Sequence, residues 1–269
     1  MAVQGTYGKI RVFEDFNGWG ATASIADATA GTRYNDLCFI AVSGAVDFIN
    51  TLDESGGVAS FSGAAGAADG IVITSSPLQP SASGTIVMEA RFKGASATDL
   101  RVFCGWQETL DTAETVNPFT LSTTTLTSND AGNAVGFYAD TGATTDDFRF
   151  HASLDGTELT TAAVYAPGST STTLGALGIR TNTTITADSW YIARVEINPD
   201  GTALGYFGHT TMAGGAALAP RLVARLTNSG ALDQTALYYP VLHLLAESTG
   251  DPLLECDYFG FTGNRDWAA

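Results

Sequence analysis

Short runs in which apolar and polar residues alternate recur along the whole chain, and clusters of Gly, Asn, Asp, Ser and Thr separate them. A period of two places successive side chains on opposite faces of a β-strand, and no long run has the period of an amphipathic helix. The pattern therefore predicts an all-β protein with about fifteen short strands, which suits two packed antiparallel sheets. The predicted strands are Ile10–Phe16, Leu37–Val42, Val46–Leu52, Val58–Phe61, Gly70–Thr74, Thr85–Lys93, Leu100–Gln107, Ala134–Ala139, Asp147–Leu154, Thr160–Tyr165, Trp190–Asn198, Ala203–His209, Leu222–Leu226, Tyr238–Ala246 and Leu254–Thr262.

The clearest predicted hairpin spans Trp190–His209 and turns at Asn198-Pro199-Asp200-Gly201. Proline suits the second position of such a turn because its φ is already fixed, and glycine accepts a positive φ. Three stretches rich in small and polar residues predict long loops, with Phe119 and Leu121 expected to anchor the first of them. These loops are Thr109–Asn129, Pro167–Thr186 and Met212–Pro220.

The alternation also assigns faces to the strands. One side of each strand is apolar and predicts the core, while the other side carries charged residues and a tryptophan, Trp190. The polar side could form a ligand or partner surface, or it could hold ordinary cross-strand ion pairs worth roughly 0.2–1 kcal/mol each. The regular spacing favours ion pairs on a solvated sheet. The residues concerned are Glu89, Arg91, Arg149, His151, Arg194 and Glu196.

Composition and charge exclude several classes of partner. The chain carries 28 acidic and 12 basic residues, a net charge of −16, and charged residues make up only 15% of it. A chain this acidic repels phosphate backbones and anionic lipid surfaces, and no basic stripe is present. We therefore expect no nucleic acid and no membrane partner.

The three cysteines are Cys38, Cys104 and Cys256. They lie in apolar runs without a CxxC pair, so we expect buried thiols and no zinc site.

The first residues lack an apolar signal segment, and no apolar run is long enough for a membrane helix. We therefore expect synthesis in a reducing cytoplasm. No linker or internal repeat divides the sequence, which predicts one domain over residues 1–269.

Five segments carry a resemblance to a known superfamily, beginning with a glycine-led strand and ending with the partner strand of a tight turn. They are Gly136–Asp140, Phe148–Phe150, Trp190–Ile197, Asn198–Thr202 and Gly205–Gly208. In this order they resemble the concanavalin A-like lectin/glucanase jelly roll, and structural proteins of tailed bacteriophages built on it. The resemblance implies a two-sheet antiparallel β-sandwich in which the last strand, Leu254–Thr262, lies near the first, Ile10–Phe16.

The resemblance also supplies a test for catalysis. Glucanases of this superfamily carry an E-x-D-x-x-E strand because one carboxyl must protonate the leaving oxygen while another attacks. The nearest match places Glu255 and Asp257 in the first two positions but Gly260 in the last. We therefore expect no glycosidase activity, and we interpret Glu255 and Asp257 as exposed carboxylates of an edge or sheet.

No other constellation predicts chemistry. The histidines His151, His209 and His243 are far apart in sequence, and no GxSxG motif is present. His151 is expected to be a surface residue. Acidic loop clusters at Asn129, Asp130, Asp146 and Asp147 could suit calcium, but their spacing is not that of an EF-hand, so solvated acids are expected. The sequence thus predicts no catalytic residue, no metal and no cofactor.

Sugar binding would need an exposed aromatic ring beside hydrogen-bonding groups. Trp106 shares a strand face with apolar residues and is expected in the core, whereas Trp19 and Trp267 could be exposed. The candidate ligand-binding residues are Trp19, Trp267, Arg149, His151 and Arg194.

These observations lead to three functional hypotheses. The first is a non-enzymatic virion structural protein of a tailed bacteriophage, a capsid decoration or appendage protein. It would be a homo-oligomer docked on the major capsid or other virion proteins, made in the host cytoplasm and located in the virion. The second is a carbohydrate-binding module of a phage fibre or a host-glycan adhesin. A glycoside hydrolase ranks third.

Overall fold

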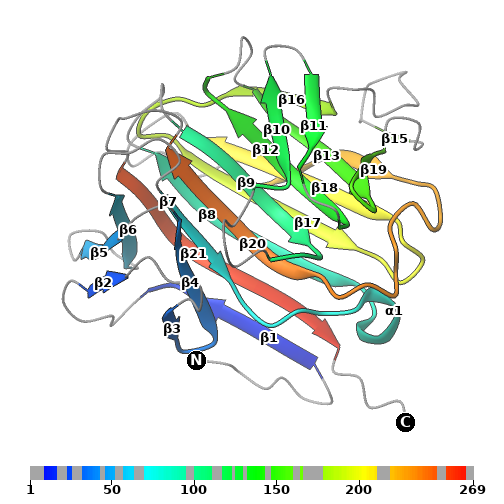
Figure 1. The fold of residues 1–269 in the computed structure, drawn as a ribbon, viewed down its shortest axis with the longest axis horizontal. Coiled ribbons are helices and arrows are strands. Elements are labelled where there is room, and N and C mark those ends of the chain that lie inside the picture. The colour runs from blue at the N-terminus through cyan, green and yellow to red at the C-terminus, as the bar shows by residue number, and fades with distance from the viewer. Residues whose placement is uncertain are drawn as a thin grey trace.

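The computed structural model describes two antiparallel β-sheets that pack face to face, with a small separate hairpin (Figure 1). The residues it describes are 9–16, 23–25, 32–42, 46–51, 57–63, 70–94, 100–110, 117–122, 125–129, 132–142, 147–159, 164–165, 178–210, 219–246 and 253–264. Within these ranges the one α-helix is the single turn α1 (Pro80–Ser83), and no helix is long and apolar enough to cross a membrane.

The first sheet, sheet A, has ten strands in the order β15-β19-β18-β17-β8-β21-β6-β5-β2, with β1 paired to β21. Its strands are β1 (Lys9–Glu14), β2 (Ala23–Ile25), β5 (Val46–Thr51), β6 (Val58–Gly63), β8 (Ile86–Gly94), β15 (Val164–Tyr165), β17 (Trp190–Ile197), β18 (Ala203–Thr210), β19 (Arg221–Leu226) and β21 (Leu253–Asn264). The predicted neighbourhood of the first and last strands is confirmed, because Val12 lies opposite Phe261 in the β1–β21 pair.

The second sheet, sheet B, has nine strands in the order β14-β13-β12-β9-β20-β7-β4-β3, with β16 paired to β13. Its strands are β3 (Thr32–Tyr34), β4 (Leu37–Val42), β7 (Gly70–Thr74), β9 (Leu100–Gln107), β12 (Ala134–Asp140), β13 (Asp147–Leu154), β14 (Thr157–Glu158), β16 (Ile179–Thr184) and β20 (Tyr239–Ala246). The predicted fold class, an all-β two-sheet antiparallel sandwich of the jelly-roll kind, is confirmed. That residues 1–269 form one domain stays a prediction.

The predicted hairpin at Trp190–His209 is also confirmed, as β17 and β18 pair from Trp190–Thr210 to Ile197–Ala203. Its turn closes through a hydrogen bond in which the Gly201 amide donates to the Asn198 carbonyl at 3.0 Å. Gly201 has a φ of +78°, a left-handed conformation that glycine adopts without a steric penalty.

Two of the predicted loops contain strands instead. Within Thr109–Asn129 the strands β10 (Phe119–Ser122) and β11 (Thr125–Ser128) form a hairpin, and within Pro167–Thr186 lies β16. These strands are built mainly from threonine and serine, so apolar alternation, on which the prediction rested, is weak in them. The predicted strand Thr160–Tyr165 is described only as the two-residue β15, and most of Met212–Pro220 lies outside the described residues.

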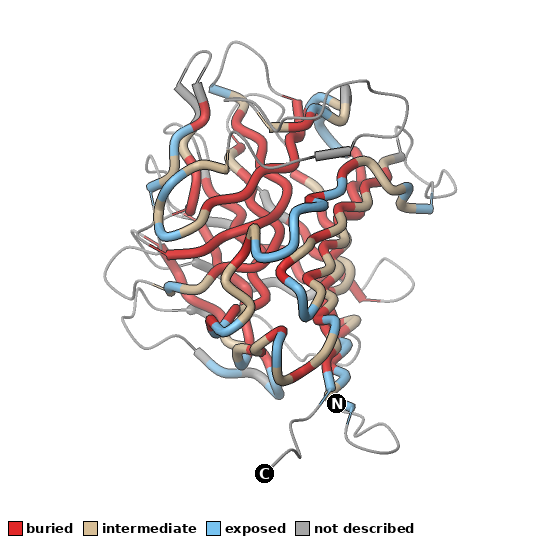
Figure 2. Tube along the Cα trace, turned by 90° about the vertical axis from the view of Figure 1, so that its right-hand side faces the viewer, coloured by how far each residue is buried: buried red, intermediate tan, exposed pale blue. Residues whose placement is uncertain are grey.

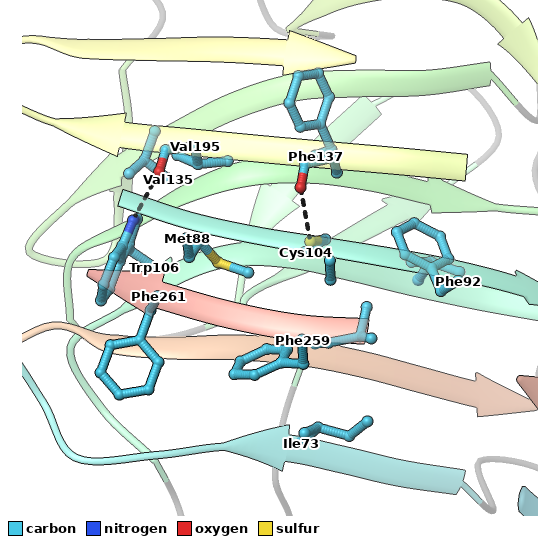
Figure 3. Packing of buried hydrophobic residues seen from close by; sticks show 14 of the residues in the cluster. Ile73, Met88, Phe92, Cys104, Trp106, Val135, Phe137, Val195, Phe259 and Phe261 are labelled. Atoms are coloured by element: carbon cyan, nitrogen blue, oxygen red, sulfur yellow. Dashed lines mark hydrogen bonds between the residues drawn. The ribbon is translucent and has the colours of Figure 1, made fainter. Parts of the chain in front are cut away.

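The space between the sheets holds one large apolar core (Figure 3). Trp106 of β9 is fully buried there, as predicted, and its indole nitrogen donates to the Val195 carbonyl of β17 at 3.1 Å. This bond links the two sheets directly and satisfies a polar group that would otherwise be buried without a partner. A glycine, Gly205, makes room for the ring of Phe150, since a Cβ at position 205 would lie 2.5 Å from that ring.

The predicted burial of the thiols holds for Cys104 and Cys256, which are in this core, while Cys38 is half-buried. Burial raises the pKa of all three thiols, with the coulombic effect of Arg33 opposing it at Cys38.

A second, smaller apolar cluster covers the outer face of sheet B. The β10–β11 hairpin contributes Phe119 and Leu126 to it, and both are buried. Phe119 packs edge-on against Phe103 and Tyr138 of the sheet, with ring centroids 5.7 and 6.3 Å apart. Phe119 thus anchors its segment as predicted, whereas the side chain of Leu121 lies outside the described residues.

Candidate functional site

The outer face of sheet A is a polar surface on which three cations, Arg91, Lys93 and Arg194, lie beside carboxylates. Arg91 pairs with Asp257, and the Lys93 amine lies 2.7 Å from the Glu255 carboxylate. The third cation, Arg194, lies between two acids. Its Nη2 is 2.7 Å from Glu196 Oε1 and its Nη1 is 3.6 Å from Glu89 Oε2. The predicted cross-strand ion pairing is therefore present between Glu89 and Arg194, and Arg91 pairs across strands with Asp257, whereas Glu196 pairs with Arg194 within β17.

Trp190 lies on this same face, as predicted from the alternation, but it is covered. The guanidinium of Arg91 lies 4.6 Å from the centre of its ring and the amine of Lys93 lies 4.8 Å from it. Only 6% of the residue is exposed. Cation–π contacts of this kind stabilise the face, and they remove Trp190 as an open platform for a ligand.

An aromatic pair of one exposed and one half-buried ring lies at the β1 side of this face. Phe13 of β1 is 48% exposed, and its ring centroid is 5.4 Å from that of Tyr258 on β21, with 30° between the planes. The Tyr258 hydroxyl donates to Glu89 Oε1 at 2.7 Å. Burial and the adjacent Glu89 raise the pKa of Tyr258, so this hydroxyl remains a donor at neutral pH. The pair thus combines apolar area with hydrogen-bonding groups.

The two carboxylates of the glucanase-like strand are not exposed edge groups, which corrects the prediction for Glu255. Strand β21 pairs with β8, β6 and β1, and Glu255 is buried, with Ser60 donating to it at 3.2 Å. Asp257 is half-buried at a β-bulge between Cys256 and Tyr258. Gly260 lies under the ring of Phe13, since a Cβ there would be 3.1 Å from the ring. Position 260, which carries a carboxyl in glucanases, is here a glycine against which the ring of Phe13 packs.

Arg149 and His151 do not join this face, and the prediction that His151 is a surface residue is wrong. Both residues lie on β13 of sheet B, and both are buried under the second cluster. The ring of His151 lies 4.9 Å from that of Phe119. Alternation correctly assigned the outer side of the strand, but it could not predict that the β10–β11 hairpin covers that side.

The environment of the buried histidines disfavours charge. Burial, helped by Arg149, lowers the pKa of His151 to about 3, and burial alone lowers that of His243 to about 3. Among the described residues, neither imidazole has a hydrogen-bond partner for its ring nitrogens. Desolvation also lowers the pKa of Arg149, and Arg180 adds to this. Groups sealed in this way have no access to a substrate at the surface.

Of the five candidate ligand-binding residues, Arg194 is the one that the structure places on an accessible face. Trp19 and Trp267 lie outside the described residues. The sequence reasoning missed Phe13 and Tyr258, although a signal existed. In the first strand Phe13 shares its side with Lys9 and Arg11, while Val12 faces the core.

The acidic clusters that could suit calcium are only partly described. Asp147 pairs with Arg180, and Asn129 is exposed, while Asp130 and Asp146 lie outside the described residues. In the described part of the chain, no group of three or more His, Cys, Asp or Glu side chains is placed to hold a metal ion.

No family model and no curated protein matches this sequence. Among solved structures, a protein of unknown function from Shewanella oneidensis MR-1 is similar, with a TM-score of 0.54 and 14% identity over 100% of this chain and 92% of that one. The carbohydrate recognition domain of Emp46p has a TM-score of 0.47 at 10% identity, over 91% of this chain and 97% of that one. For lectin I of Ulex europaeus the values are 0.45 and 10%, over 91% and 99%. These similarities concern the fold.

Proposed function

We propose that this protein is a non-catalytic carbohydrate-binding module that uses the outer face of sheet A. The observation that carries the proposal is the exposed Phe13 stacked beside Tyr258, with Glu89 bound to the tyrosine hydroxyl. Sugars present apolar C–H faces and many hydroxyls, so a site for them combines aromatic area with fixed donors and acceptors. On sheet B, the outer face as far as the structure describes it offers no such surface, because the second cluster covers it.

The charge arrangement on sheet A supports binding over hydrolysis. Glycoside hydrolysis requires two carboxyl groups at opposite sides of the scissile bond, one as acid and one as base or nucleophile. Here Glu255 and Asp257 are already paired with Lys93 and Arg91, and the third position is Gly260. The absence of enzymatic activity is accordingly part of the proposal.

Affinity electrophoresis of the full chain in gels that contain galactomannan, xyloglucan or laminarin tests the proposal. We expect at least one of these neutral polysaccharides to retard migration, and we expect no reducing sugar to be released on prolonged incubation. If none of them and no glycan on a broad array is bound, the proposal is wrong. Release of reducing ends would instead identify a hydrolase.

The virion role implied by the sequence resemblance is our second proposal, as a decoration or appendage protein bound to the major capsid or other virion proteins. The observation that favours an assembly role is the presence of two exposed large apolar side chains, Phe13 and Leu237, which are 48% and 52% exposed. A protein surface docked over either side chain would remove it from water. Mass spectrometry of purified virions checks the proposal, and virions that lack the chain would contradict it.

A further inference from the structure

The strand register of sheet A aligns five positions in a line across five neighbouring strands. Phe13 of β1 lies opposite Gly260 of β21, Gly260 opposite Glu89 of β8, Glu89 opposite Arg194 of β17, and Arg194 opposite Tyr206 of β18. Neighbouring strands are about 4.8 Å apart, so this cross-strand row is roughly 19 Å long. A single sugar ring would cover only part of that length.

The two ends of the cross-strand row are aromatic. At one end, the absence of a side chain at Gly260 lets the ring of Phe13 lie against β21, and Tyr258 extends the apolar area beside it. At the other end, Tyr206 is half-buried, and the guanidinium of Arg194 lies 5.7 Å from its ring centre. Tyr206 is more exposed than Trp190, and its cation lies farther from the ring centre than the two that cover Trp190, so part of the Tyr206 ring stays open beside Arg194. Each end therefore offers ring area on which an apolar face of a sugar can stack.

The centre of the row is polar and fixed in position. Glu89 accepts from the Tyr258 hydroxyl through one oxygen and faces Arg194 with the other, while the Arg194 Nε donates to Glu196 at 2.8 Å. A carboxylate has about four acceptor sites and a guanidinium has five donors, so both retain capacity for further bonds. Their mutual contacts hold them in place before a ligand arrives, which lowers the entropy that binding costs.

We infer that the cross-strand row binds a neutral oligosaccharide that runs across the strands of sheet A, with sugar rings stacked on Phe13 and Tyr206 and hydroxyls bound by Glu89 and Arg194. This inference rests on the proposed carbohydrate-binding function and deepens it. A neutral ligand fits better than an anion, because the centre offers donors and acceptors while the two carboxylates beside Arg194, Glu89 and Glu196, leave it without net attraction for negative charge.

Isothermal titration calorimetry of the full chain tests the inference with short and long members of the cello-, xylo-, manno- and laminari-oligosaccharide series. Alginate oligosaccharides serve as the anionic counterpart. The variants are Phe13→Ala and Tyr206→Ala, with Phe13→Tyr as a conservative replacement. Leu237→Ala is the matched control, because Leu237 is equally exposed but is not in the row. Circular dichroism verifies that each variant is folded.

We expect a neutral series to bind with an affinity that rises with chain length, because only longer members reach both rings. Each alanine variant should weaken binding by about tenfold or more, which corresponds to about 1.4 kcal/mol, while Phe13→Tyr and Leu237→Ala should leave it nearly unchanged. Tighter binding of alginate than of every neutral series would overturn the inference.

Failure of this inference can be told apart from failure of the proposed function. If the unmodified chain binds a glycan and both alanine variants bind it equally well, the row is wrong and the function stands. If the chain binds no glycan, and sedimentation shows self-association that Phe13→Ala abolishes, the row is a contact between copies of the chain. In that case the carbohydrate-binding function and the inference about the row are both wrong.

Discussion

The two outer faces of the sandwich begin from the same sequence pattern and end in opposite environments. On sheet A, β8 alternates between buried and half-buried residues along its length, whereas on sheet B all seven residues of β12 are buried (Figure 2). Charged side chains on sheet A lie in ion pairs at the surface, while His151 on sheet B lies among aromatic rings. Alternation identifies the side of a strand that faces away from the core, but a covering segment decides whether that side meets water.

The largest effect that separates the two faces should come from acid. The unfolded chain binds a proton at each histidine near pH 6.5, whereas His151 and His243 in the fold do so only near pH 3. Because the unfolded state binds more protons between these values, stability should fall as the pH drops from 6.5 to 3. The loss should reach about 3 kcal/mol per histidine at pH 4. Urea unfolding at a series of pH values measures it.

The double variant His151→Leu/His243→Leu tests the origin of this acid sensitivity. It should flatten the dependence of the unfolding free energy on pH over that interval. The half-buried His209 is not part of the covered face, so His209→Leu is the matched control and should leave the dependence in place. An unchanged slope in the double variant would show that other groups, such as carboxylates, cause the acid sensitivity.

Removing the ring of Phe119 should produce the next largest effect. Phe119 is fully buried and packs against His151, Phe103 and Tyr138, so Phe119→Ala removes the main contact of the hairpin with sheet B. We expect a loss of about 3–5 kcal/mol, measured by urea unfolding at neutral pH. The corresponding change on the open face, Phe13→Ala, should cost less than about 1 kcal/mol because half of that ring is already in water. Equal losses would contradict the difference between the faces.

A single methyl group at Gly260 should have a smaller effect. The new Cβ would lie 3.1 Å from both the Phe13 ring and the Val12 carbonyl, so the ring must shift outward. We expect Gly260→Ala to cost about 1–2 kcal/mol and to weaken any sugar binding at the aromatic pair. Urea unfolding and calorimetry measure the two effects. Leu237→Ala is the control, because it changes an exposed residue outside the cross-strand row. Gly230→Ala would not serve, because Gly230 has a φ of +73°, a conformation in which alanine is strained. Unchanged stability and binding in Gly260→Ala would mean that the ring of Phe13 does not rest on this glycine.

The sequence was sufficient to predict most strands of both sheets, the β17–β18 hairpin and the buried Trp106, because each depends on local alternation or on turn residues. It was insufficient for the β10–β11 hairpin, whose threonine-rich strands give little alternation, and hence for the burial of Arg149 and His151 beneath it. Phe13 and Tyr258 are far apart in the chain, and their contact depends on the register of the β1–β21 pair, which the sequence pattern does not specify.

The smallest effect should come from the ion pairs of sheet A. Arg194 is 39% exposed, and its contacts with Glu89 and Glu196 lie at the solvent boundary, where water and salt screen them. We expect Arg194→Met to change the unfolding free energy by less than about 1 kcal/mol, and less still at high salt. A loss of several kcal/mol would mean that this face, too, is covered. Because Arg194 is in the cross-strand row, the same variant should nevertheless weaken oligosaccharide binding clearly. A residue that contributes little to folding but much to binding would distinguish an open recognition surface from the covered face of sheet B.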